Sequence, residues 1–488
     1  MAGSLRDKSL TAFFWLILDK LGGSSINFIV TIVLAWLLTP KDFGLVAMVM
    51  VFFEISSTFI QSGFAFALIR EKTISEIDKS TTFVFNFVTA VLFYLLLFFC
   101  APAIARFFNQ DILTAIIRIM GLNLIVESFA IIQHAVLTQR IDFKTQTKVR
   151  FLAVVISGVS ALILAYFGYG VWSLVGRIGI MTLMSTIFLW VVNPWKFSLK
   201  FSRQSFLKLF GFGSKLLAES IIDKAFRHAL QVAIGKVYSA ETLGFFTQSN
   251  NFCNMLANNF QQAIQKVTYP VLAKLQDNRK KLKEGYRQII IMSSFAIIPL
   301  MVIMGVLAEP LMLTFVGEKW LKSVPFLQLL VIAGITYHFN SINLDLLLVL
   351  GRVDLCLRLE VIKKVIAALT MFLGYKLYDL YGLVMGQVIS NYIALLINTY
   401  YSDKFLDYPL LEQIRDILPT IVFSAVMGSL IFIFLYYVPL PNSVILFVGS
   451  GLGLMAYMLM HYLADTKEIA LLREYIIPKT IKFITNKA

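Results

Sequence analysis

The chain has 488 residues, of which 58% are hydrophobic and only 15% are charged, and its formal net charge is +15. A soluble globular protein is nearer half apolar and a quarter charged, so this composition excludes an ordinary soluble fold. The basic residues lie mostly between long apolar runs, a pattern typical of membrane topology and not of a nucleic-acid-binding face. The three cysteines form no C-x-x-C pair, and neither a metal site nor a cofactor is predicted.

The apolar runs predict an all-α integral membrane protein. Segments such as 43–68 and 443–464 are long enough to cross the roughly 30 Å hydrocarbon layer as helices, and they lack the short alternation of barrel strands. The first apolar stretch continues to Leu38, too long for a signal peptide, so it is predicted to be a spanning helix. Proline, glycine and charged residues divide the chain into about fourteen predicted helices: 10–38, 43–69, 80–108, 111–138, 148–168, 170–193, 206–238, 243–270, 286–316, 323–350, 355–378, 381–402, 412–438 and 442–464.

Basic residues alternate between the predicted loops. One set of loops, together with both termini, holds 28 Lys and Arg residues, with the densest cluster at 274–287, whereas the alternate loops hold 6. Short loops rich in Lys and Arg stay on the cytoplasmic side of a bilayer. The sequence therefore predicts cytoplasmic N and C termini, an even number of helices and short external loops.

An internal repeat relates the first six predicted helices to the next six. Residues 34–44 and 234–244 share their apolar positions, an acid near the turn and a closing glycine, at an offset of 200. A parallel repeat of six helices predicts two lobes related by an axis along the membrane normal, as in transporters that work by alternating access. Two later pairs share an offset of 212: 140–143 with 352–355, and 169–170 with 381–382.

The repeat sets the predicted domain organisation. An N-terminal lobe of helices 1–6 is expected over residues 1–200 and a C-terminal lobe of helices 7–12 over residues 201–405. Two further helices follow over residues 406–465, and residues 466–488 form a cytoplasmic tail. We expect a central cavity between the two lobes.

Motifs in the first 175 residues resemble those of bacterial polysaccharide transporters. They include L-A-W-L-L-T-P-K-D-F-G at 34–44, R-I-D-F at 140–143 and G-Y-G-V-W at 168–172. The chain is similar to the Wzx-type flippases, most closely those of the colanic-acid type, in the multidrug/oligosaccharidyl-lipid/polysaccharide exporter superfamily. The resemblance implies a transporter of the bacterial inner membrane, not an enzyme. It would flip an oligosaccharide on polyprenyl pyrophosphate to the outer leaflet for surface polysaccharide synthesis, with the polysaccharide polymerase machinery as a further partner.

The seventh predicted helix is unusually rich in charge. Positions 215, 219, 223 and 227 step by four and form one polar stripe, which cannot face lipid. Lysine and arginine are the usual partners of phosphate, so Lys215, Lys224 and Arg227 are predicted to form a cationic wall that binds the pyrophosphate. The alternative is a set of ion pairs that join helices, and Asp223 is the expected partner of Arg227.

Charges elsewhere in the predicted spans extend this hypothesis. Asp19 and Glu219 occupy equivalent places in the repeat and, with Asp223, are candidates for binding a coupling cation. Pairing of Asp19 with Lys20 is the alternative. Lys20 and, in the fourth helix, Arg118 are predicted as further contacts of the substrate phosphates.

The eighth predicted helix is rich in amides. Amides both donate and accept hydrogen bonds, which suits sugar hydroxyls, although they also join helices to one another. Asn251, Asn254, Asn258 and Gln262 are therefore predicted to line a hydrated cavity that binds the glycan.

Two other functions compete with a flippase. An organic-cation antiporter of the same superfamily would favour carboxylates in its cavity, whereas bases outnumber acids on the seventh helix. A membrane-bound glycosyltransferase, polymerase or ligase would need catalytic groups at a membrane face, and neither a long external loop nor a paired-carboxylate motif is predicted.

Overall fold

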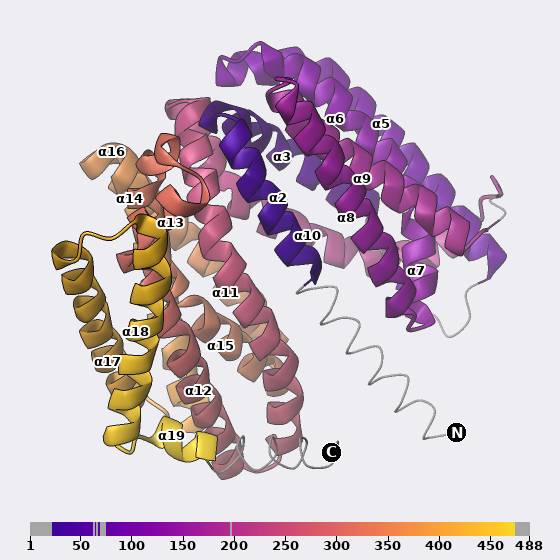
Figure 1. Cartoon of the computed structure of the whole chain (residues 1–488). Helices are drawn as coiled ribbons and strands as arrows, with labels where there is room; N and C mark the ends of the chain where they lie inside the picture. The colour runs from indigo at the N-terminus through magenta and orange to yellow at the C-terminus, as the bar shows by residue number, and fades with distance from the viewer. Residues whose placement is uncertain (1–21, 62–63, 65–66, 69–74, 196–197, 474–488) are drawn as a thin grey trace, which may run out of the picture. The chain divides into compact units, whose positions relative to one another are not determined.

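The computed structural model describes residues 22–61, 64, 67–68, 75–195 and 198–473, and the regular structure in these ranges is helical. The chain forms two compact units, Met1–Thr247 and Gln248–Ala488. Helix α11 continues from the first unit into the second (Figure 1). The domain boundary expected near residue 200 stays a prediction, and in the structure α10 packs against α3 and α5 of the first unit.

The N-terminal unit is a bundle of long helices. Helix α5 packs on its chain neighbour α6 and α8 on its neighbour α9, whereas α3 packs on α10, which is distant in the sequence. A capping box of Ser75 and Asp78 fixes the start of α5, because each side chain bonds the other residue's backbone N–H. The helices are α2 (Ser24–Leu37), α3 (Pro40–Gln61), α5 (Glu76–Phe108), α6 (Ile112–Ser128), α7 (Ile131–Gln139), α8 (Phe143–Tyr166), α9 (Val171–Val192), α10 (Arg203–Val237) and the start of α11 (Ala240–Leu275).

The helix predicted over 111–138 is broken. Helices α6 and α7 meet at a bend of 40°, so this segment is one bent span or a re-entrant turn. Phe129 and Ala130 lie between the two helices, and no proline or glycine marks the break in the sequence. The apolar pattern continues across it, which is why a single helix was expected.

The first repeat of the sequence appears directly in the local structure. Helix α2 ends at Leu37 and α3 begins at Pro40, while α10 ends at Val237 and α11 begins at Ala240, an offset of 200 at both positions. Equivalent side chains also start both second helices: the amide of Asp42 donates to the Thr39 hydroxyl, and that of Thr242 donates to the Ser239 hydroxyl.

The closing glycines of this repeat lie where α3 and α11 cross. A Cβ on Gly44 would overlap the backbone carbonyl of Ala240, and a Cβ on Gly244 would overlap the carbonyl of Pro40. These four residues are related by the same offset of 200, so each half of the repeat supplies the same two positions. Only glycine lets two helix backbones approach this closely, and small residues serve the same purpose in membrane helix pairs.

The C-terminal unit contains the rest of α11 and a second set of helices. Helices α12 and α17 pack together, and α17 lies beside α18 (Figure 1). The unit comprises α12 (Arg279–Val306), α13 (Ala308–Phe315), the 3₁₀ helix η2 (Glu318–Ser323), α14 (Val324–Gly334), α15 (Tyr337–Val349), α16 (Val353–Leu406), α17 (Leu410–Tyr437), α18 (Asn442–Leu463) and α19 (Lys467–Leu471). The helices expected over 286–316 and 323–350 are each divided, at Leu307 and between α14 and α15.

Helix α16 contains two spans joined by a sharp turn. Tyr378 and Asp379 have non-helical backbone angles, with Asp379 at φ 52°. The two arms touch closely: a Cβ on Gly374 would overlap the carbonyl of Gly382, and the reverse also holds. This geometry confirms the break that the sequence predicts between 355–378 and 381–402.

The second repeat offset needs a correction. Helix α8 begins at Phe143 and α16 at Val353, so the offset at the start of these helices is 210, and it is 209 at the turn that follows. The residue that shares the backbone conformation of Gly170 is Asp379, with φ near 50° and ψ −128° in both cases, and Gly382 lies within the helix that follows. The sequence comparison aligned Gly170 with Gly382 because both are glycines. The turn conformation does not require glycine in both halves of the repeat, so this alignment was wrong.

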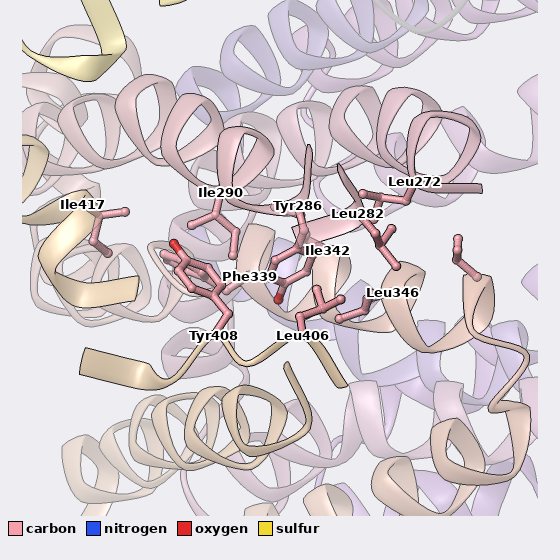
Figure 2. Close-up of a cluster of buried hydrophobic side chains, with 11 residues drawn as sticks. Leu272, Leu282, Tyr286, Ile290, Phe339, Ile342, Leu346, Leu406, Tyr408 and Ile417 are labelled. Carbon is pink, nitrogen blue, oxygen red and sulfur yellow. The ribbon is translucent and has the colours of Figure 1, made fainter. Parts of the chain in front are cut away.

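The C-terminal unit has a buried core at one end of its bundle. Side chains from α11, α12, α15, α16 and α17 converge there (Figure 2), and Tyr286 and Tyr408 meet edge to face at 6.0 Å. The cluster consists of Leu272, Leu282, Tyr286, Ile290, Phe339, Ile342, Leu346, Val349, Leu406, Tyr408 and Ile417.

One buried carboxylate ties the end of this bundle together. Asp416, whose side chain is 2% exposed, pairs with Arg287 and accepts hydrogen bonds from the Tyr408 hydroxyl at 2.7 Å and the Lys467 ammonium at 3.0 Å. Burial and the nearby Asp416 carboxylate raise the pKa of Tyr408, so its hydroxyl remains a donor. The network joins α12, α17 and the start of α19.

The helices are long and apolar enough for a multi-pass membrane protein. Among the described residues, nine helices satisfy length and composition for a membrane span, or ten if the bent pair α6–α7 is one span. Helix α16 counts once there although it turns back on itself. Helices α10 and α11 carry too many charged and amide side chains to qualify by composition alone, so the count of fourteen stays a prediction.

Candidate functional site

The packing of α10 on α3 brings charged side chains together inside the N-terminal unit. His228 on α10 lies 3.0 Å from the Glu54 carboxylate on α3, measured from Nε2 to Oε2, and its Nδ1 lies 2.7 Å from Gln231. Lys224, one turn earlier on α10, donates to the Glu54 backbone carbonyl at 3.3 Å. Two bases of α10 therefore converge on a single turn of α3.

A second carboxylate, on α6, contacts α3 about one turn beyond Glu54. The Glu127 carboxylate on α6 accepts hydrogen bonds from the Ser57 hydroxyl at 3.0 and 3.1 Å and from the Gln61 amide at 2.8 Å. Both donors are uncharged, and within the described part of the chain no basic side chain forms an ion pair with Glu127. The Lys224 charge acts on Glu127 at longer range, without forming an ion pair. A carboxylate without an ion-pair partner is costly inside a membrane, so Glu127 is a candidate functional position.

Both carboxylates open onto one cavity of about 500 Å³ in the N-terminal unit. Helices α3, α6, α7 and α9 line it, and α9 contributes hydroxyl groups. The lining side chains are Met50, Phe53, Glu54, Ser57, Gln61, Glu127, Ala130, Ile131, His134, Ile178, Met181, Thr182, Ser185 and Thr186. The wall is mostly apolar with a small number of polar groups, as in small-molecule sites.

The predicted charges of the seventh helix divide into several environments on α10. The ion pair expected between Asp223 and Arg227 is present, and the Arg227 side chain is 65% exposed. Lys224 instead donates to the backbone carbonyl of Glu54, a residue that lines the cavity. The side chains of Lys215 and Glu219 lie outside the described structure, although both residues belong to α10.

Asp19 and Lys20 also lie outside the described residues. Arg118 lies on α6 and packs against α5, with its guanidinium 4.3 Å from the Phe98 ring centre and Nε 3.4 Å from the Phe98 carbonyl. In the described structure no contact of Arg118 reaches α10. Its predicted role in phosphate binding stays a prediction.

The predicted sugar-binding amides lie on α11 in the C-terminal unit. Asn251 is exposed, whereas Asn254 and Gln262 are partly buried. The side chain of Asn258 lies outside the described structure. Sugar binding by this face of α11 stays a prediction.

An arginine that the sequence analysis did not single out holds α2 to α9. Arg177 donates to the Asn27 side chain at 3.0 Å, to the Asn27 carbonyl at 3.1 Å and to the Thr31 hydroxyl at 3.1 Å. The signal available in the sequence was an arginine in the middle of the apolar run 171–192. Glu54 and Glu127 carried the same signal, but neither contact partner could be assigned from the sequence.

A known protein family matches this chain. The model of the family described as polysaccharide biosynthesis protein matches residues 33–325, more than half of the chain. The chain belongs to this family.

Several relatives carry names that agree with this assignment. The chain is 22% identical over 375 residues to the teichuronic acid biosynthesis protein TuaB of Bacillus subtilis, covering 76% of this chain and 78% of that protein. It is 23% identical to the succinoglycan biosynthesis transport protein ExoT of Rhizobium meliloti, over 65% of both chains. It is 21% identical to the lipopolysaccharide biosynthesis protein WzxC of Escherichia coli, over 82% of both chains.

Solved structures identify the fold of this polysaccharide biosynthesis protein. The inward closed conformation of the lipid II flippase MurJ superposes with a TM-score of 0.73 at 14% identity, covering 93% of this chain and 98% of that chain. An inward-facing multidrug resistance MATE family transporter of the MOP superfamily gives a TM-score of 0.61 at 14% identity, covering 81% and 98%. The chain therefore has the fold shared by these two transporters.

Proposed function

We propose that this polysaccharide biosynthesis protein flips an oligosaccharide linked to polyprenyl pyrophosphate from the cytoplasmic to the outer leaflet of the bacterial inner membrane. The glycan would be a repeat unit of a surface polysaccharide such as a lipopolysaccharide or exopolysaccharide. In this proposal both termini are cytoplasmic, and the polysaccharide polymerase machinery receives the flipped lipid. The two lobes alternate between inward-open and outward-open states.

The convergence of Lys224 and His228 on α3 is the observation that carries the proposal. Helix α10 contributes two nitrogen bases next to a cavity that Glu54, Glu127 and several hydroxyl groups line. Concentrated phosphate charge is bound by such donors, and Lys224 spends only one of its three N–H groups on the Glu54 carbonyl. The fold shared with a lipid II flippase supports the same class of cargo.

An organic-cation antiporter is the second candidate, because the cavity carries two carboxylates. Glu54 and Glu127 both line it, and carboxylates attract cationic drugs. However, His228 already neutralises Glu54 when protonated, so only Glu127 would be left for an organic cation.

The test is transport by the full-length protein in vesicles. Wild-type protein is reconstituted with a fluorescent polyprenyl-pyrophosphate oligosaccharide, and lipid reaching the far leaflet is measured by an impermeant quencher. We expect flipping by the wild type and a loss of at least tenfold in Lys224→Ala. Lys236→Ala is the matched control, since Lys236 is an exposed lysine at the end of α10 that bonds the Phe107 carbonyl.

Two results would overturn the flippase proposal. Wild-type vesicles that leave the glycan lipid in place but export a cationic dye would favour the antiporter. Equal loss of flipping in Lys224→Ala and Lys236→Ala would mean that the cationic contact near Glu54 has no special role.

A further inference from the structure

We propose that Glu127 is a proton-binding site and that the proton it binds is the ion coupled to lipid transport. This inference rests on the proposed flippase function for its coupling role. The site consists of Glu127 on α6 with Ser57 and Gln61 on α3, and it opens onto the 500 Å³ cavity that Glu54 also lines.

The balance of forces at Glu127 leaves both charge states accessible. Partial burial without an ion-pair partner disfavours the charged carboxylate, whereas hydrogen bonds from Ser57 and Gln61 favour it. A salt bridge would instead have fixed the carboxylate in its charged form. Acids placed this way inside membrane bundles are characteristic of proton pathways.

The neighbouring groups favour a proton over a metal cation. Ser57 and Gln61 both present hydrogen atoms to the carboxylate, and the Gln61 amide also donates to the Ser57 hydroxyl at 3.2 Å. A sodium ion would need Ser57 and Gln61 to turn oxygen atoms toward it, whereas in the structure both groups donate to the Glu127 carboxylate. A proton needs only one carboxylate oxygen and space for the resulting hydroxyl.

The charged and titratable groups that face this cavity are few. Glu54 comes from α3, His134 from α7 and Glu127 from α6, whereas α9 contributes only uncharged side chains. From α10, His228 and Lys224 reach the cavity wall through Glu54. Glu127 forms no ion pair in the described structure, although the Lys224 charge also acts on it electrostatically.

Helix α3 provides the physical link between proton and lipid. Ser57 and Gln61 contact Glu127, and Glu54, one turn earlier on the same helix, contacts His228 and Lys224 of α10. Binding a proton forms one O–H bond at Glu127 and removes one negative charge, without transfer of electrons. This change weakens the pull of Glu127 on Ser57 and Gln61, so α3 can shift against α10, where the proposed lipid contact lies.

The first test measures the proton itself and needs no transport. Infrared difference spectra of the full-length protein between neutral and acidic pH report the carbonyl stretch of a neutral carboxyl group. We expect a band that is lost in Glu127→Gln and retained in Glu241→Gln, a matched control at an exposed position at the start of α11. A band that is unchanged in Glu127→Gln would overturn the proposal.

Ser57→Ala keeps the test decisive if Glu127→Gln fails to fold. The variant removes one hydrogen bond that stabilises the carboxylate, so the neutral carboxyl should persist to higher pH by roughly half a unit to one unit. If the neutral-carboxyl band disappears at the same pH in Ser57→Ala as in the wild type, the group that is protonated is not Glu127.

The second test measures coupling in the reconstituted vesicles. We expect an inward proton gradient to accelerate outward flipping of the glycan lipid about tenfold, and Glu127→Gln to lose this acceleration while Glu241→Gln keeps it. Acceleration by a sodium gradient with no response to protons would overturn the proton assignment. If the wild type flips no glycan lipid under any gradient, the flippase proposal fails, while the infrared result still decides whether Glu127 binds a proton.

Discussion

Substitution of Gly44 by alanine tests whether α3 and α11 cross in backbone contact. The added Cβ would overlap the carbonyl of Ala240, and this obstacle is backbone, so no side-chain rotation relieves it. Overpacking of this kind costs about 1–3 kcal/mol, and alanine regains about 0.5–1 kcal/mol of helix stability. Because the obstacle is rigid, we take the upper end and expect a net loss of about 2 kcal/mol.

Thermal unfolding in detergent, followed by tryptophan fluorescence, measures this effect. A loss of about 2 kcal/mol should lower the Tm of Gly44→Ala by roughly 4–8 °C. Gly211→Ala is the matched control on α10, because a Cβ there meets no atom within 4 Å, and its Tm should stay the same or rise slightly. Equal Tm values for the two variants would refute the crossing.

The symmetry of the crossing adds a second, independent check. Gly244→Ala places its Cβ against the Pro40 carbonyl at the same contact, so it should be as destabilising as Gly44→Ala. One separation of the helices relieves both overlaps, so the double variant should lose clearly less than the sum of the two single losses. Simple additivity would mean that the two glycines do not share one contact.

Three further substitutions test single contacts, each read out by thermal unfolding unless another measurement is named. Asp416→Ala removes the carboxylate that three side chains share and should cost about 3 kcal/mol, and an unchanged Tm would contradict the network. Asp379→Gly relieves a positive φ and should stabilise the protein by roughly 1 kcal/mol, whereas a lower Tm would show that the aspartate side chain is needed there. Arg177→Leu should free α2 from α9, so limited proteolysis should cut α2 faster than in Arg106→Leu, an exposed control; equal rates would refute the tie.

The sequence by itself determined the features that depend on local composition. Apolar runs of about twenty residues must become membrane helices, because lipid cannot satisfy free backbone groups, and this follows without any tertiary contact. Local sequence also predicted the break before α3. It predicted the pairing of Asp223 with Arg227 as well, because the two residues lie one helical turn apart. The repeat at an offset of 200 was visible because it preserves both a turn and the glycine that follows it.

Features that join distant segments were decided only by the tertiary structure. The partner of Glu54 is His228, 174 residues away, and the partner of Glu127 is Ser57, 70 residues away. A sequence shows that each acid lies in an apolar run, but the partner depends on which helix faces it and at what height along the axis. Helix register is set by the packing of whole faces, including the crossing at Gly44 and Gly244. The charges of α10 could therefore be predicted from the sequence, whereas the carboxylate cavity beside them could not.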